Sequence, residues 1–64
     1  MFTIKLNGKF FANSGNLVDT FEEARNFSDY DEVHATIKLY RLLQKGHVEV
    51  FGDYGTENEF VEDI

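Results

Sequence analysis

The sequence predicts an α+β fold in which a small antiparallel sheet packs against one long helix. FTIKL at residues 2–6 and HVEVF at residues 47–51 alternate apolar and polar side chains, which is the period of a half-buried strand. Between them, residues 29–45 carry apolar side chains at helical spacing, and Gly46 follows as a stop signal. A helix between two strand-forming segments fits a single two-layer domain, which is also what a length of 64 residues allows.

Asn7-Gly8 directly follows the first predicted strand and indicates a β-hairpin. Both central positions of a type I′ turn need a positive φ, and this dipeptide is the strongest short signal for such a turn. KFFAN at residues 9–13 is therefore the predicted returning strand. A turn over residues 14–16 follows, and residues 17–19 could form a short third strand.

Two helix starts follow the hairpin. Thr20 and Glu23 have the spacing of a capping box, with Thr20 as N-cap and Glu23 reaching back, and predict a short helix over residues 21–26. Ser28-Asp29 begins the long helix, which is expected to run to about Lys45. Its first turn holds acids that the helix dipole favours, namely Asp29, Asp31 and Glu32.

The apolar side chains of the predicted long helix spread over about 220 degrees, whereas packing on one sheet needs roughly 100 degrees. The surplus consists of Ala35, Leu39 and Leu42. The short helix or the C-terminal segment could cover these residues, as could a second copy of the chain or a partner groove. Simple exposure, which small proteins tolerate for isolated residues, is the remaining alternative.

The other arc of this helix holds a basic stripe, His34, Lys38, Arg41 and Lys45. One interpretation is a solvated face with its cations near the helix C-terminus, where the dipole favours them. The other is a docking site for an anion, such as the acidic end of this chain or of a neighbouring subunit. Exposed ion pairs contribute only about 0.2–1 kcal/mol each, so number or geometry would have to supply the strength.

Acidic charge is concentrated at the C-terminal end. The formal charge is −6; residues 52–64 hold five acids and no Lys or Arg, while residues 1–51 hold seven acids and six bases, a net of −1. We therefore divide the chain into a compact α+β body, residues 1–51, and an acidic tail, residues 52–64. Such a tail is either a solvated, disordered end or a binding element, in which acids steer it to a basic surface and apolar groups anchor it. The candidate partner-binding residues are Asp53, Tyr54, Glu57, Glu59, Phe60, Glu62 and Asp63.

The sequence contains no pattern that predicts catalysis, a cofactor or a metal site. There is no Cys, which excludes disulfides and thiolate zinc sites, and there are only two His. Ser14 and Ser28 fall in a turn and at a helix cap. No calcium-binding or phosphate-binding loop is present. We therefore expect a binding protein rather than an enzyme.

Charge and hydropathy limit the partners and the compartment. A pI near 4.6 disfavours direct binding of nucleic acid and favours a basic partner, such as a nucleic-acid-binding protein. No segment approaches the roughly 18 apolar residues of a membrane span. The opening MFTIKLNGKFF lacks the pattern of a signal peptide, so we expect a cytoplasmic protein.

LVDTFEEARNFSDYDEV at residues 17–33 resembles a pattern in small early or accessory proteins of phages and prophages of Gram-positive bacteria. Those proteins often open with a hairpin such as FTIKLNGKFFAN, followed by a T-x-x-E-A-x-x-F stretch, here residues 20–27. The resemblance covers residues 2–51. It implies a mobile-element accessory protein in a bacterial host cell, of a kind that binds and blocks a host or defence enzyme, sometimes by presenting DNA-like charge. It identifies no site residue.

Two functional hypotheses follow. In the first, the protein inhibits a host or anti-phage defence protein, such as a nucleic-acid-processing enzyme, and its acidic tail meets basic groups on the target. In the second, it has a structural or assembly role as a homodimer formed by Ala35, Leu39 and Leu42, and the tail only maintains solubility.

Overall fold

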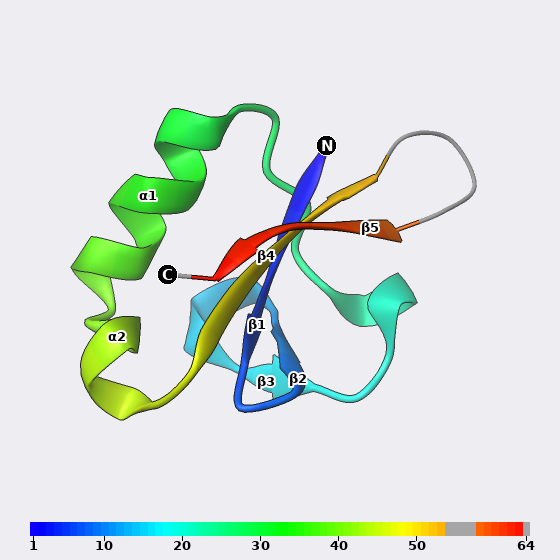
Figure 1. The fold of residues 1–64 in the computed structure, drawn as a ribbon. Helices are drawn as coiled ribbons and strands as arrows, with labels where there is room; N and C mark the ends of the chain where they lie inside the picture. The colour runs from blue at the N-terminus through cyan, green and yellow to red at the C-terminus, as the bar shows by residue number, and fades with distance from the viewer. Residues whose placement is uncertain (54–57, 64) are drawn as a thin grey trace.

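The structure, a computed structural model, contains a five-stranded antiparallel sheet in the order β3-β2-β1-β4-β5, with two helices along one side of it (Figure 1). It describes residues 1–53 and 58–63, and side chains as far as Gly52. The strands are β1 (Phe2–Leu6), β2 (Lys9–Phe11), β3 (Leu17–Val18), β4 (Val48–Asp53) and β5 (Asn58–Asp63). The helical elements are α1 (Tyr30–Leu39), α2 (Leu42–Lys45) and two 3-10 turns, η1 (Asn13–Gly15) and η2 (Phe21–Glu23). The predicted α+β class is confirmed.

The N-terminal hairpin has the predicted form. Asn7 and Gly8 have φ values of 51° and 83°, and Leu6 lies opposite Lys9 across the turn. The returning strand is present as β2 but ends at Phe11 instead of residue 13, and the short third strand is present as β3 over Leu17–Val18. The first prediction succeeds because the Asn-Gly signal is local: the two residues themselves supply the backbone geometry that the turn requires.

The hydrophobic core lies between the helices and one face of the sheet. Alternate residues of β1 and β4 line this face, since Ile4 is paired with Val50 and Leu6 with Val48. The buried cluster comprises Ile4, Leu6, Phe11, Phe27, Val33, Ile37, Leu42, Val48 and Val50. A buried aromatic side chain removes about 150–250 Å² from water, so two phenylalanines contribute a large share of the burial that a chain of this size can reach.

The opposite face of the sheet is covered by aromatic side chains instead of a helix. The Lys5 ammonium lies 4.8 Å from the ring centroid of Phe10 and 4.9 Å from that of Phe51, so one cation bridges two rings. Phe21 of η2 meets Phe10 edge-on at 5.9 Å, and Thr3 is fully buried. Contacts between a cation and a ring face contribute about 0.5–1 kcal/mol when exposed and more when desolvated.

The prediction of a short helix over residues 21–26 is wrong beyond Glu23. Only η2 forms, and Ala24 is already extended at φ −70° and ψ 149°. The Arg25 N–H donates to the Phe11 carbonyl at 3.0 Å, and Phe2 and Phe27 exchange two backbone hydrogen bonds of 2.8 Å. The segment follows the sheet because this brings Phe27 into the core, which local helix propensity cannot outweigh.

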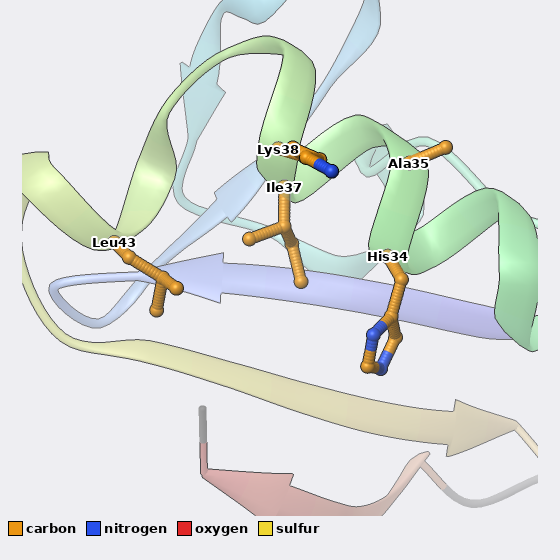
Figure 2. Close-up of a pocket in the computed structure, with 5 residues that line it drawn as sticks. All are labelled: His34, Ala35, Ile37, Lys38 and Leu43. Atoms are coloured by element: carbon orange, nitrogen blue, oxygen red, sulfur yellow. The ribbon is translucent and has the colours of Figure 1, made fainter.

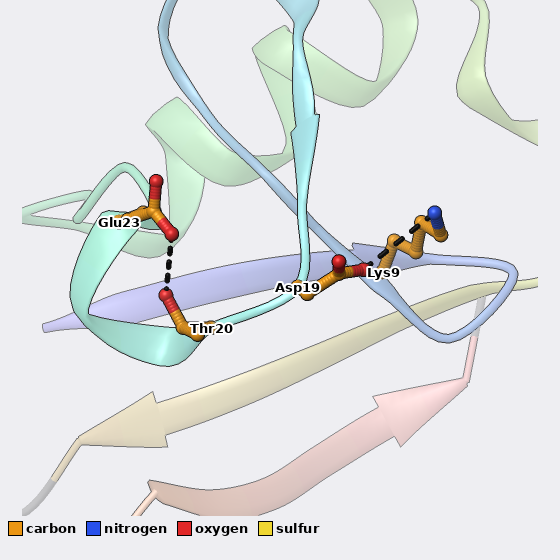
Figure 3. A network of polar contacts seen from close by, with 4 residues as sticks. All are labelled: Lys9, Asp19, Thr20 and Glu23. Carbon is orange, nitrogen blue, oxygen red and sulfur yellow. Dashed lines mark hydrogen bonds and ion pairs between the residues drawn. The ribbon is translucent and has the colours of Figure 1, made fainter.

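Thr20 occupies the N-cap position of η2, but it does not make the predicted capping box. Its hydroxyl donates to the Glu23 carboxylate at 2.8 Å and makes no side-chain bond to the backbone of the turn. Beside this contact, the Lys9 ammonium lies 3.5 Å from the Asp19 carboxylate (Figure 3). Both contacts are exposed and link the end of β3 to its neighbours.

The long helix starts as predicted but does not run unbroken to Lys45. Asp29 is the N-cap of α1, where its carboxylate accepts a hydrogen bond from the Glu32 N–H at 2.9 Å. The helix ends at Leu39 because Arg41 adopts the left-handed conformation, with φ 55° and ψ 44°, before α2 begins. Because of this break, the side chains of α2 no longer continue the faces of α1. Leu42, predicted to be surplus, is only 2% exposed, whereas Leu43 is 54% exposed.

Asn7 joins the end of α2 to the sheet. Its side-chain carbonyl accepts from the His47 N–H at 2.9 Å, its backbone N–H donates to the His47 carbonyl at 2.9 Å, and its side-chain amide reaches the Lys45 carbonyl at 3.4 Å. Gly46, the predicted helix stop, leaves room for this Asn7 side chain. A Cβ at this position would clash with the Asn7 side chain, so any other residue would force Asn7 to move from the position in which it makes these hydrogen bonds.

The prediction that residues 52–64 form a loop or tail is wrong for the described part of this segment. Gly52 and Asp53 extend β4 beyond the predicted strand, and Asn58–Asp63 forms β5, whose register runs from Asp53–Asn58 to Glu49–Asp63. The predicted boundary between a body and a tail at residue 51 therefore falls inside a strand. NEFVED is rich in charge, but charged residues are compatible with an edge strand.

The left-handed conformation of Arg41 predicts the relative stabilities of a glycine and an alanine variant at this position. Arg41→Gly should be more stable than Arg41→Ala by about 1 kcal/mol, because alanine pays the left-handed penalty that glycine avoids. If the helix were uninterrupted, the alanine variant would instead be the more stable one, since glycine costs about 1 kcal/mol relative to alanine in a helix interior. Urea unfolding of the two variants measures the difference, and a more stable alanine variant would contradict the break.

Candidate protein-binding surfaces

Basic and acidic residues lie on different strands of the sheet. β1 and β2 carry Lys5 and Lys9 and no acid. β4 and β5 carry no Lys or Arg but hold five acids, which we call the acidic edge: Glu49, Asp53, Glu59, Glu62 and Asp63. Because β5 is the outermost strand on this side, acids supplied by two strands gather along one border of the molecule.

The start of α1 adds further acids near one end of this edge. Phe2 is paired with Gly52 of β4, and its ring meets Tyr30 of α1 edge-on at 5.5 Å, so the start of the helix and the end of β4 lie toward the same end of the molecule (Figure 1). Asp31 and Glu32 are exposed there. The Glu32 carboxylate also accepts a hydrogen bond from the Ser28 hydroxyl at 2.8 Å, which orients it on the helix.

The predicted partner-binding residues have different outcomes. Asp53, Glu59, Phe60, Glu62 and Asp63 occupy strand positions, where Phe60 is paired with Phe51 and Glu59 with Gly52. Tyr54 and Glu57 lie outside the described residues. The acids themselves are evident in the sequence, but their place in the β4–β5 ladder is not. Glu49 was not among the predicted residues, yet it pairs with Asp63, and its alternation with Val48 and Val50 marks it as a residue of the opposite face.

The predicted basic stripe is divided by the helix break. His34 and Lys38 remain one turn apart on α1, and both are exposed. Arg41 lies in the left-handed link and Lys45 in α2, so the four residues do not share one helical face. Whether the stripe receives the acids of β5 depends on side chains beyond Gly52, which lie outside the described part of the chain.

The predicted apolar face of the long helix is also divided. Ala35 and Leu39 are exposed, Leu39 at 76%, while Leu42 is buried in the core. Leu42 therefore cannot contribute to a dimer or partner face. The prediction failed here because the helical wheel assumes constant phase, and no residue near position 41 carries a glycine-like signal of the break.

A groove with a volume of about 490 Å³ is lined by residues of α1 and α2. In Figure 2 the His34, Ile37 and Leu43 side chains point from the helices toward the sheet, while Lys38 and Ala35 point away from it. The His34 ring lies 4.6 Å from the Tyr30 ring, measured between centroids. Leu43 reaches this groove as a result of the phase change at Arg41.

Other kinds of site find no support within residues 1–53 and 58–63. Among residues 1–52, whose side chains are described, no group of three His, Cys, Asp or Glu residues could hold a metal ion. None of the described helices is long and apolar enough to cross a membrane. Comparisons with protein-family models, with curated proteins and with solved structures found no match.

If β5 belongs to the folded sheet, deleting it must destabilise the protein. A chain ending at Asp53 loses the whole β4–β5 ladder, and since each hydrogen bond contributes a net 0.5–1.5 kcal/mol, we expect a loss of roughly 2 kcal/mol or more. Urea unfolding measures it. The control carries Glu59→Gln, Glu62→Gln and Asp63→Asn in the full chain, which removes charge but keeps the strand. Equal stability of the shortened and full chains would restore the tail interpretation.

Proposed function

We propose that this protein acts by binding another protein whose surface is basic, and that the acidic edge is the binding surface. The observation that carries the proposal is the gathering of five acids on two adjacent strands that contain no Lys or Arg. An acidic surface of this kind steers a basic partner into contact and disfavours acidic ones. The strand pairing supports the proposal further, because a preorganised surface loses less entropy on binding than a disordered tail does.

The charge density constrains the partner's mode of recognition. Six residues of β5 span about 20 Å at roughly 3.4 Å per residue, and they include three acids. Duplex DNA carries one charge per about 1.7 Å, or roughly twelve over the same length. The edge therefore resembles DNA in the sign of its charge but is less dense, so apolar contacts must supply part of the affinity. Among the predicted anchors, Phe60 lies within β5.

The target class we propose is a nucleic-acid-processing enzyme or an anti-phage defence protein, inhibited when the acidic edge occupies its basic groove. Proteins of this class offer the basic grooves that the edge complements. The resemblance of residues 2–51 to small phage and prophage proteins favours the same class, and it suggests the cytoplasm of a bacterial host as the place of action.

Affinity capture from bacterial lysate tests this function. The full-length protein is compared with the variant in which Glu59→Gln, Glu62→Gln and Asp63→Asn remove three charges from β5. The matched control is Asp19→Asn, Glu22→Gln and Glu23→Gln, which removes three charges from the end of β3 and η2 and gives the same net charge. We expect a basic protein, identified by mass spectrometry, to bind wild type and control but not the β5 variant.

The salt dependence of the capture is a second, independent test of the acidic edge. Because exposed charge pairs are screened beyond about 8 Å at physiological ionic strength, raising the salt should release the partner. Capture that resists salt, or that is equal for the β5 variant and the control, would show that the acidic edge is not the binding surface.

A homodimer with a structural or assembly role is the second candidate function. The observation that favours it is the 76% exposure of Leu39 beside exposed Ala35 on α1. We expect such a dimer to be insensitive to salt, because its contacts are apolar, and to dissociate on Leu39→Glu. Leu17→Glu, at an exposed leucine of β3 outside this face, is the control. Sedimentation at high micromolar concentration measures the mass, and a wild-type monomer would eliminate this candidate.

A further inference from the structure

The two borders of the sheet differ greatly in length. One border is β3, which has two residues, and the other is β5, which has six. Within the described residues, β5 is paired only with β4, so its outer side has no strand beside it. In an antiparallel strand, alternate residues direct their N–H and C=O groups to opposite sides. β5 therefore presents a row of backbone donors and acceptors along the acidic edge.

We propose that this outer side of β5 receives an extended, Lys- or Arg-containing segment of the partner, which joins the sheet as a sixth strand. The inference rests on the proposed function and specifies how the acidic edge binds. In such strand addition, backbone hydrogen bonds supply the affinity and the side chains supply the selectivity. Here the selectivity comes from charge.

Charge identifies the occupant as a basic strand rather than a second copy of β5. Three of the six residues of β5 are acidic. The neighbouring strand β4, on the inner side of β5, adds Glu49 and Asp53. Like charges opposite each other on neighbouring strands are destabilising, whereas opposite charges stabilise the pair. Two β5 strands side by side would align acid against acid, so the same charges that admit a basic segment oppose self-association at this border.

The irregularity in the β4–β5 ladder indicates where the added strand pairs best. The register shifts between Val50 and Phe51, since Phe51 is paired with Phe60 but Val50 with Glu62. A bulge of this kind bends its strand and disrupts pairing locally. Asn58, Glu59 and Phe60 lie on one side of the shift and form the longer regular run. The partner segment should therefore pair first with these three residues.

The test uses three short capped peptides of alternating valine and lysine, six residues long, that differ only in backbone N-methylation. The first has no methyl group, the second is methylated on alternate amides, and the third on every amide. All three carry the same charge. The second keeps one complete hydrogen-bonding side and can still join a sheet, whereas the third cannot donate any backbone hydrogen bond. Binding to the full-length protein is followed through the backbone amide resonances of β5.

We expect the first two peptides to shift the amide resonances of Asn58, Glu59 and Phe60 and to protect amides of β5 from hydrogen exchange. The third should bind more weakly by about tenfold or more, since several hydrogen bonds are lost. The triple β5 variant should weaken binding of the first peptide, and the Asp19, Glu22 and Glu23 control should not. The amide spectrum of each variant shows that it remains folded.

The outcomes separate this inference from the proposed function. If all three peptides bind equally, or if none shifts the β5 resonances, strand addition is wrong; the proposed function then stands or falls by the capture experiment alone. If the capture shows no dependence on the β5 charges, both the function and this mode of binding are overturned.

Discussion

The pairing of β1 with β4 is the interaction on which the rest of the structure depends. It joins residues 2–6 to residues 48–52 in an unbroken antiparallel register and places Ile4 beside Val50 and Leu6 beside Val48. The helices pack against the apolar face that this pairing forms. β5 can pair with β4 only because β1 holds β4 in place. A shift of one residue would move every apolar side chain of β4 to the other face, so the register must be fixed firmly. Asn7 contributes to this by hydrogen bonding to the backbone at both Lys45 and His47.

Local signals in the sequence predicted the elements whose geometry is set by their own residues. Asn7-Gly8 specifies its turn, Asp29 caps α1, and the alternation around Val48 and Val50 marks a strand. The failures occurred where distant contacts decide the conformation. Ala24–Phe27 became extended because Phe27 is needed in the core, and the helix was interrupted at Arg41 because this turns Leu42 inward. Neither requirement can be read from the neighbouring residues.

The candidate site shows the same division. Composition alone located the acids that distinguish residues 52–64, but it suggested a tail because NEFVED is dominated by charge. The pairing partner of this segment is β4, which is itself held by β1, so its strand character follows from the tertiary arrangement. The apolar face of the long helix was mispredicted for a related reason. Leu42 and Leu43 are adjacent and chemically identical, and only the break at Arg41 decides which is buried and which lines the groove.

The central position of β1 has a consequence for how the chain is made. Synthesis proceeds from the N-terminus, so β1 is available early, while the strand that must lie beside it, β4, is produced only after both helices. Until β4 is synthesised, Val33 and Ile37 can contact only part of the core that buries them in the folded protein, because Val48 and Val50 are missing. The growing chain therefore gains little from folding in stages, and most of its stability should arise in one late step, when β4 pairs with β1 and β5 can follow.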